Sequence, residues 1–281
     1  MVYGTPMPAR GSFWLNFMPK LTQLYRLDKE VHDHLQTVLD DHRKKLGTKD
    51  EKRDPVTAML KLNLSEEDLR FGMSTIVHAG HDTTTYTSAY CLYLLARHTE
   101  VQDRLRTVIQ ELMKGKTLND LTVQDVKDCP LLVATVKESL RMYASIPFLP
   151  RECTEDIELD TGKVDRRGKS KMLKLKKGTN VLMPIFLMHR DSDKWTDSRE
   201  FRPERHIVGH ELFDSSKNYM PFSYGSRVCI GQTMAQLEVM LLLVMILGTY
   251  KVSVSPGFRP NIKAGISLVS GNGMSLVFDK L

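Results

Sequence analysis

The chain contains few cysteines, and none of them stands in a motif that would pair them or bind zinc. The four are Cys91, Cys129, Cys153 and Cys229, and no CxxC pair or zinc-like spacing with histidine occurs in the 281 residues. The chain is also too long to be a small secreted scaffold that depends on disulfides. We therefore expect free thiols and a reducing compartment.

Long hydrophobic runs are absent as well. The longest wholly apolar run, residues 239–247, is far shorter than the ~20 residues that a membrane-spanning helix needs, so we interpret it as a buried helix. The first residues, MVYGTPMPARGSFW, lack the charged leader and apolar core of a secretory signal peptide. The sequence thus predicts neither a signal peptide nor a transmembrane helix in this chain.

Neither basic nor acidic residues are gathered together over most of the chain. Forty lysines and arginines stand against 34 acidic residues, a net charge of +6, and they are spread along the sequence. A nucleic-acid surface would need basic residues gathered with exposed aromatics, and no such stripe occurs. One basic stretch, residues 163–177, is typical of an enlarged strand hairpin; we interpret it as a solvated loop, with an acidic partner or a membrane surface as the lesser alternative.

Apolar residues make up 41% of the chain, which is enough for a core, and their spacing predicts a mainly α fold with small β-sheets. We expect helices over residues 21–46, 65–97, 100–113, 131–142 and 233–247, with Ser65 as the N-cap of the longest one. Short strands are predicted over 153–160 and within 172–183, and again near the C-terminus. The irregular stretch that follows, up to Tyr224, is of a length that usually carries function.

The segment FSYGSRVCIG, residues 222–231, directly precedes the last predicted helix. A cysteine in a glycine-bracketed loop at a helix N-terminus lies among backbone amides that favour the thiolate. Gly225 and Gly231 permit a tight loop that a flat ligand can approach, and Arg227 supplies a positive charge suited to a carboxylate. A buried structural cysteine is the alternative, but it would leave the surrounding pattern unexplained.

This segment resembles the haem-binding loop of the cytochrome P450 family, FxxGxRxCxG, at every specified position. The positions are Phe222, Gly225, Arg227, Cys229 and Gly231. The resemblance implies that haem b (iron protoporphyrin IX) is the cofactor, that Cys229 is the axial ligand of its iron, and that Arg227 pairs with a haem propionate.

Two upstream motifs strengthen the resemblance. In KESLR, Glu138 and Arg141 are three residues apart on one helix face, which alone would indicate an ordinary surface pair. The segment is similar to the family's ExxR motif, and FRPER is similar to the proline–arginine motif that precedes the haem loop. The resemblance implies a structural network of Glu138, Arg141 and Arg205 that holds the irregular stretch beneath the haem.

The longest predicted helix contains AGHDTT, residues 79–84. Small residues one turn apart could simply form a helix-packing notch, which is the alternative. The segment resembles the family's oxygen-activation groove, and that resemblance implies haem contact at Ala79 and Gly80. It also implies that Thr83 orders dioxygen and a water molecule, and that Asp82 belongs to the proton-delivery path.

Three weaker expectations also come from the resemblance. Arg151 stands where the family often places a second propionate-binding arginine. Residues 145–149 and 264–267 are expected to line the substrate pocket.

The resemblance covers the chain from about Leu21 onward and identifies it as the C-terminal part of a cytochrome P450 fold. We expect residues 1–281 to form a single incomplete domain, because the family's N-terminal portion, with its WxxxR helix and the membrane helix of eukaryotic members, is not in the sequence. For the full-length form, the resemblance implies the cytosolic face of the endoplasmic reticulum membrane. We therefore expect the chain to be a truncated product, an incomplete gene model or a fragment.

The expected function is that of a haem-thiolate monooxygenase that inserts one oxygen atom into an apolar organic substrate. Its electrons would come from NADPH through a separate cytochrome P450 reductase, with cytochrome b5 as an optional second donor. A non-catalytic haem-binding or inert fragment is the main alternative. A helical interaction protein without haem would leave all of the motifs unexplained.

Overall fold

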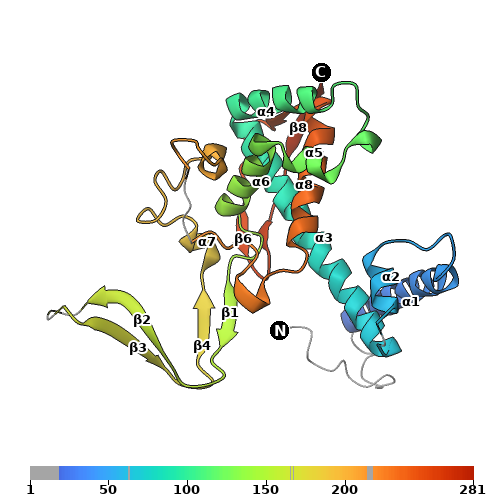
Figure 1. The fold of residues 1–281 in the computed structure, drawn as a ribbon, viewed down its shortest axis with the longest axis horizontal. Helices are drawn as coiled ribbons and strands as arrows, with labels where there is room; N and C mark the ends of the chain where they lie inside the picture. Colours follow the sequence, from blue (N-terminus) through green and yellow to red (C-terminus); the bar gives the residue numbers. More distant parts are fainter. Residues whose placement is uncertain (1–18, 63, 165, 167, 214–217) are drawn as a thin grey trace. The chain divides into compact units, whose positions relative to one another are not determined.

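The computed structural model describes residues 19–62, 64–164, 166, 168–213 and 218–281, and in them helices predominate over small sheets (Figure 1). The α-helices are α1 (Pro19–Lys45), α2 (Pro55–Leu60), α3 (Glu66–Arg97), α4 (Thr99–Leu112), α5 (Val123–Lys127), α6 (Pro130–Met142), α7 (Ile185–Met188) and α8 (Gln232–Leu247). Single 3-10 turns are η2 (Leu118–Asp120), η3 (Pro203–His206) and η4 (Gly225–Arg227). Each of the five helices expected from apolar spacing has a counterpart within two residues at each end.

The strands pair in twos. The described sheets are β1 (Leu149–Glu152) with β4 (Asn180–Met183), β2 (Ile157–Val164) with β3 (Ser170–Leu175), β5 (Tyr250–Val254) with β8 (Leu276–Lys280), and β6 (Ile262–Ala264) with β7 (Leu268–Ser270), all antiparallel. The predicted strand at 153–160 begins four residues later, at Ile157. Strand β1 was not predicted, because Pro150 lies inside it and proline removes a ladder donor.

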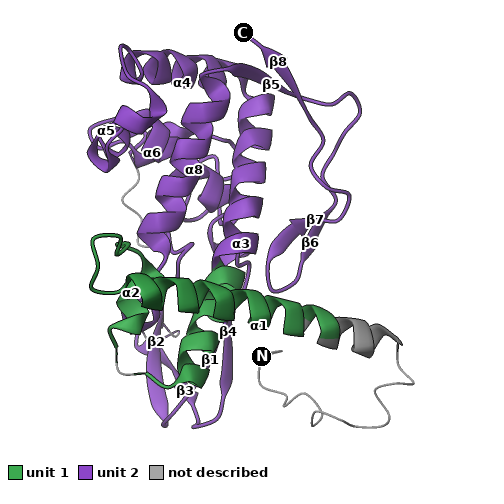
Figure 2. Cartoon of the chain, turned by 90° about the vertical axis from the view of Figure 1, so that its right-hand side faces the viewer, with its two compact units in different colours: residues 1–79 green, residues 80–281 purple. Residues whose placement is uncertain are grey.

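The chain divides into two compact units, residues 1–79 and 80–281, and the boundary falls within α3 (Figure 2). In the first unit, Leu35 and Leu39 of α1 form a small core with Leu69 and Met73 of α3. Asp54 caps α2, since its carboxylate accepts a hydrogen bond from Thr57 N–H at 2.9 Å. Ser65 caps α3 as expected, because its hydroxyl accepts from Asp68 N–H at 3.1 Å.

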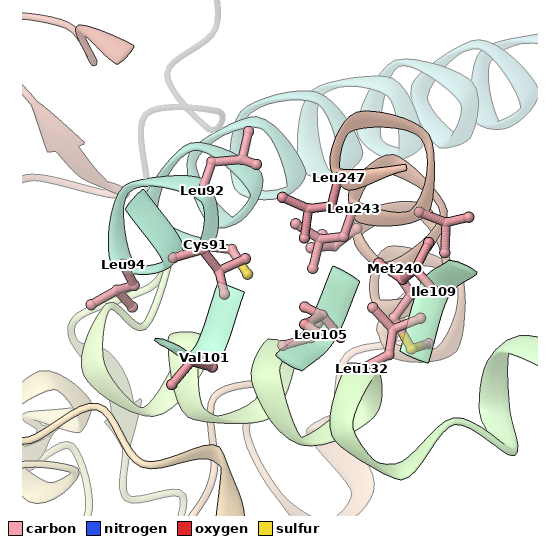
Figure 3. Close-up of a cluster of buried hydrophobic side chains, with 14 of the residues drawn as sticks. Cys91, Leu92, Leu94, Val101, Leu105, Ile109, Leu132, Met240, Leu243 and Leu247 are labelled. Carbon is pink, nitrogen blue, oxygen red and sulfur yellow. The ribbon is translucent and has the colours of Figure 1, made fainter. Parts of the chain in front are cut away.

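The second unit holds the main core, to which helices α3, α4, α5, α6 and α8 and strand β5 contribute. Figure 3 shows apolar side chains of α3, α4, α6 and α8 directed toward one another, among them Cys91, Leu105, Leu132 and Leu243. Three of these four are completely buried leucines, each of which favours folding by about 1.5–3 kcal/mol. Helix α8 thus has one face of its apolar run, 239–247, buried in the core, whereas Leu241 and Met245 of the same run are exposed. The expectation of a buried helix holds for that one face.

Gln102 joins this core to the C-terminal sheet although its side chain is polar and fully buried. Its amide nitrogen donates to Val252 O at 2.8 Å and to Leu95 O at 3.0 Å, and its amide oxygen accepts from Val252 N–H at 2.9 Å. Arg106 donates to the same oxygen at 2.7 Å. The side chain is therefore fully satisfied, which is the condition for keeping a polar group in a core.

Glu138 and Arg141 of α6 are also fully buried, and they form the charged centre of the second unit. Arg141 Nε and Nη2 donate to the two Glu138 oxygens at 2.8 and 2.9 Å, a bidentate pair. Arg205 donates to Glu138 at 3.3 Å and His206 at 3.1 Å, and Arg202 N–H donates at 2.9 Å. The structure thus brings together Glu138, Arg141 and Arg205.

The irregular stretch after β4 is held by the same arginine. Arg141 Nη1 donates to the carbonyls of His189 and Ser198 at 2.8 and 2.7 Å, and Nη2 donates to Glu200 O at 3.0 Å. The guanidinium also lies 5.3 Å from the centre of the Trp195 ring, within cation–π range. Backbone carbonyls that have no ladder partner are satisfied here by a side chain.

Among the described residues, no helix combines the length and the apolarity that crossing a membrane requires. The sequence expectation on this point concerned the whole chain, including residues 1–18, which lie outside the described residues.

We predict that Glu138→Gln lowers the free energy of unfolding by about 3–5 kcal/mol, because it leaves buried arginines without a countercharge. Urea unfolding at neutral pH measures this change. The matched control is Glu111→Gln, which removes an exposed carboxylate paired with Lys114 at the same three-residue spacing. The control should cost less than about 1 kcal/mol. Equal effects of the two variants would contradict a central role for Glu138.

A second prediction concerns pH and His189. Burial, and then the nearby Arg141 charge, lower the pKa of His189 to about 4. The unfolded chain binds this proton near pH 6.5, so acidification favours unfolding as pH falls from about 6.5 toward 4. Burial raises the pKa of Glu138, but hydrogen bonds from His206 and Arg141 outweigh it and hold that pKa at about 2. Glu138 therefore contributes fully above its unfolded pKa, near 4.5, and its contribution is lost as pH falls through about 2.

The wild-type chain should lose about 2 kcal/mol of unfolding free energy through His189 between roughly pH 7 and pH 4.5. In His189→Gln that part of the pH dependence should disappear, whereas the control His81→Gln, at an exposed histidine, should keep it. Denaturant titrations at the two pH values provide the measurement. A His189→Gln variant with the full wild-type slope would refute the assignment.

Candidate functional site

The loop before α8 presents Cys229 to solvent. Cys129, Cys153 and Cys91 are buried, and Cys229 alone of the four cysteines is exposed. Its backbone N–H donates to Phe222 O at 2.9 Å, which closes the loop on itself, and its carbonyl accepts from Gln232 N–H at 3.3 Å at the start of α8. The loop is thus tied to a rigid helix while its thiol stays accessible.

Two residues of this loop have left-handed backbone. Ser223 has φ 67° and Gly225 has φ 71°, and Val228 N–H donates to Gly225 O at 3.1 Å across the η4 turn. Glycine takes this conformation without strain, which explains Gly225. A Cβ built on Gly225 would meet no atom within 4 Å, and a Cβ on Gly231 would lie 3.8 Å from the Cys229 sulfur. The side of Gly225 on which a Cβ would lie is therefore open.

Two arginines accompany the loop. Arg227 is exposed, and no acidic side chain pairs with it within the part of the chain that the structure describes. Arg151 of β1 donates through Nη2 to the Ser223 hydroxyl at 2.9 Å, although 72 residues separate them. The structure thus places both sequence-predicted arginines at the loop, where either can bind an anionic group.

The rim of the loop is apolar and exposed. Tyr224 is 83% exposed, Ile230 is 96% exposed and Val228 is 43% exposed. Phe222, in contrast, packs on the main core as a half-buried residue. Because soluble surfaces seldom gather such side chains around one reactive group, the rim indicates an apolar ligand or partner.

Helix α3 carries the second predicted motif. Gly80, His81 and Asp82 are exposed, whereas Thr83 is half-buried. Asp82 accepts a hydrogen bond from His81 Nδ1 at 2.9 Å, a pair that sequence reasoning did not anticipate. A Cβ on Gly80 would meet nothing within 4 Å, so space is open there too. Ala79, the first residue of the motif, belongs to the other compact unit.

A chain of contacts links the buried network to the cysteine loop. His189, whose carbonyl binds Arg141, accepts a hydrogen bond at Nε2 from Met220 N–H at 3.0 Å. The Met220 carbonyl in turn accepts from Ser223 N–H at 3.1 Å. Sequence reasoning missed His189 and also His206 of the network. The only available signal was a histidine one residue after the FRPER segment, and a single histidine does not by itself indicate a role.

The chain is similar to known proteins of one family. The family model described as Cytochrome P450 matches residues 6–273. The human ultra-long-chain fatty acid omega-hydroxylase is 34% identical over 218 residues, which are 78% of this chain and 39% of that protein. Cytochrome P450 4d2 of Drosophila melanogaster is 30% identical over 286 residues, 94% of this chain and 54% of that protein.

Solved structures give the same result. The crystal structure of the cytochrome P450DA heme domain superimposes with a TM-score of 0.74 at 25% identity, and the match covers 89% of this chain and 54% of that one. The chain therefore spans about half, or less, of the length of the proteins that it matches. The partial P450 fold expected from the motifs is confirmed, and the chain belongs to the cytochrome P450 family.

Proposed function

We propose that the chain binds haem b through the Cys229 thiolate and provides the C-terminal part of a haem-thiolate monooxygenase. The observation that carries this proposal is the exposed thiol in a loop tied to the N-terminus of α8, with Arg227 and Arg151 beside it. On this proposal residues 1–281 belong to one incomplete P450 domain.

The residues present fit the cofactor. A flat apolar macrocycle would cover the exposed Val228 and Ile230, and the open space above Gly225 would admit it closely. Its two propionates need cationic partners, and Arg227 and Arg151 supply them. Haem, when bound, would supply the redox chemistry with dioxygen, and the Cys229 thiolate would hold its iron.

The chain's own residues have distinct roles in this proposal. Cys229 holds the cofactor from one side, and its loop stays fixed because Phe222 is anchored in the core. On α3, the Thr83 hydroxyl would bind a water molecule and hold its proton. The exposed Asp82 carboxylate passes protons from solvent toward that hydroxyl. Gly80, where an added Cβ would meet nothing within 4 Å, leaves room for the cofactor.

The proposed reaction inserts one oxygen atom into an apolar organic substrate, and the second is reduced to water by electrons from NADPH. A separate NADPH–cytochrome P450 reductase would deliver the electrons, with cytochrome b5 as a second donor, at the cytosolic face of the endoplasmic reticulum for a full-length form. A fatty acyl chain is the substrate class, since the human relative is named for hydroxylating ultra-long-chain fatty acids. Residues 145–149 and 264–267 would contribute to its pocket.

A second candidate is a non-catalytic haem-binding fragment. The chain spans 39–54% of the curated relatives described above, so the activity of the whole proteins is a proposal for it and both candidates need the same test. A single assay separates the two: the haem-loaded chain, reductase and NADPH are incubated with a long-chain fatty acid, and hydroxylated product is measured. Product supports the monooxygenase, whereas haem binding without product supports the second candidate.

We predict that Cys229→Ser abolishes the thiolate-type Soret band of the dithionite-reduced, carbon monoxide-treated chain, because a hydroxyl does not replace a thiolate on iron. The control Cys153→Ser alters a buried cysteine outside the loop and should retain the band. If both variants keep the band, the assignment of Cys229 is wrong.

Arg227→Gln should weaken haem binding by roughly ten- to a hundredfold, which corresponds to losing one charge-assisted hydrogen bond of about 1.5–3 kcal/mol. Titration of the apoprotein with hemin, followed by absorbance, gives the dissociation constant. The exposed Arg259→Gln variant serves as control and should bind like the wild type. Identical constants for all three proteins would exclude a role for Arg227 in holding a propionate.

A further inference from the structure

Two buried hydroxyl groups converge on the backbone carbonyl of Thr83. Thr87 Oγ1 donates to Thr83 O at 2.7 Å, and Ser145 Oγ lies 3.2 Å from the same oxygen. The two hydroxyl oxygens are 2.6 Å apart, and both residues are buried. The two hydroxyl hydrogens are available for these three contacts. The two hydroxyls and the Thr83 carbonyl therefore form one hydrogen-bonded group.

Ser145 reaches this group from outside the helix. It lies between the end of α6 at Met142 and the start of β1 at Leu149, whereas Thr83 and Thr87 lie on successive turns of α3. Its own carbonyl accepts a hydrogen bond from Leu268 N–H of β7 at 2.8 Å. The preceding residue, Ala144, is fully buried. The Ser145 hydroxyl is therefore a fixed donor attached to the rest of the second unit.

Such a donor constrains the helix at one specific turn. The carbonyl at position 83 is the regular acceptor for the N–H at position 87, and hydroxyls that bond to the same oxygen compete for it and set its tilt. Because this carbonyl belongs to Thr83, a change in its tilt bends the helix locally at the residue from which the Thr83 side chain projects.

We propose that Ser145, acting with Thr87, is a positioning residue that sets the orientation of Thr83. This inference rests on the role assigned to Thr83 under the proposed function, and it deepens that role. Ser145 is the first residue of the 145–149 segment that the proposed function assigns to the substrate pocket, and its hydroxyl points to the α3 backbone. The group that faces the reaction is then Thr83, and Ser145 acts through it.

The first experiment needs no cofactor. Hydrogen–deuterium exchange of the chain should show roughly fivefold faster exchange at amides 84–88 in Ser145→Ala, because one net hydrogen bond is lost. The matched control is Ser139→Ala, which also removes a buried serine hydroxyl, bonded to Thr135 O at 2.8 Å on α6. The control should leave amides 84–88 unchanged. Unchanged exchange in Ser145→Ala, or equal acceleration in the control, would overturn the proposal.

The second experiment uses carbon monoxide on the reduced, haem-loaded chain as a probe of groups beside the ligand. Thr83→Ala should shift the infrared stretching band of carbon monoxide, and Ser145→Ala and Thr87→Val should shift or broaden it in the same direction. Thr87→Ser, which keeps the hydroxyl, should retain the wild-type band, and Ser139→Ala should not change that band.

The outcomes test the role of Thr83 and the role of Ser145 separately. If Thr83→Ala leaves the band unchanged, the role of Thr83 in the proposed function fails. If Thr83→Ala shifts the band and Ser145→Ala does not, Thr83 keeps its role and the positioning by Ser145 fails.

Discussion

One buried carboxylate, that of Glu138, joins α6 to the irregular segment of the second unit. Removing a carboxylate from water is costly, and the cost is offset only when every lone pair has a good partner. Here the donors come from Arg141, Arg205 and His206 and from the backbone of Arg202. Because the donors at 202–206 stand 64 to 68 residues after Glu138, the requirement to satisfy one charge also fixes where this segment lies against α6.

The effect of this network extends to the cysteine loop. Arg141 binds the carbonyl of His189, His189 binds the backbone of Met220, and Met220 binds the backbone of Ser223. Each step is a short hydrogen bond between buried or half-buried groups. A stretch with little regular secondary structure thereby becomes rigid enough to hold a thiol in one place, which binding sites require of their supporting residues.

The sequence was most informative where several residue types had to occur together. The cysteine loop combines two glycines, an arginine and a cysteine at fixed spacing, and helix periodicity located the long helices because their apolar faces build the core. The pairing of Glu138 with Arg141 also follows from spacing. Its burial does not, since the same spacing at Glu111 and Lys114 gives an exposed pair.

What could not be predicted depends on contacts between distant segments. The bond from Arg151 to Ser223 and the bonds of Ser145 with α3 join residues that are far apart in the chain, and no local pattern encodes them. Strand β1 pairs with β4 across a long insertion, and its proline argued against a strand. Local propensity was overruled in these places by tertiary structure.

Gln102 has a consequence for association between chains. Val252 lies on β5, whose other side pairs with β8, so its N–H and carbonyl would otherwise be open to a further strand. The glutamine amide occupies both groups with the geometry of a neighbouring peptide. At this position the edge of β5 is already hydrogen-bonded by a side chain of the same molecule. A strand of another molecule therefore cannot pair with Val252 and aggregate there.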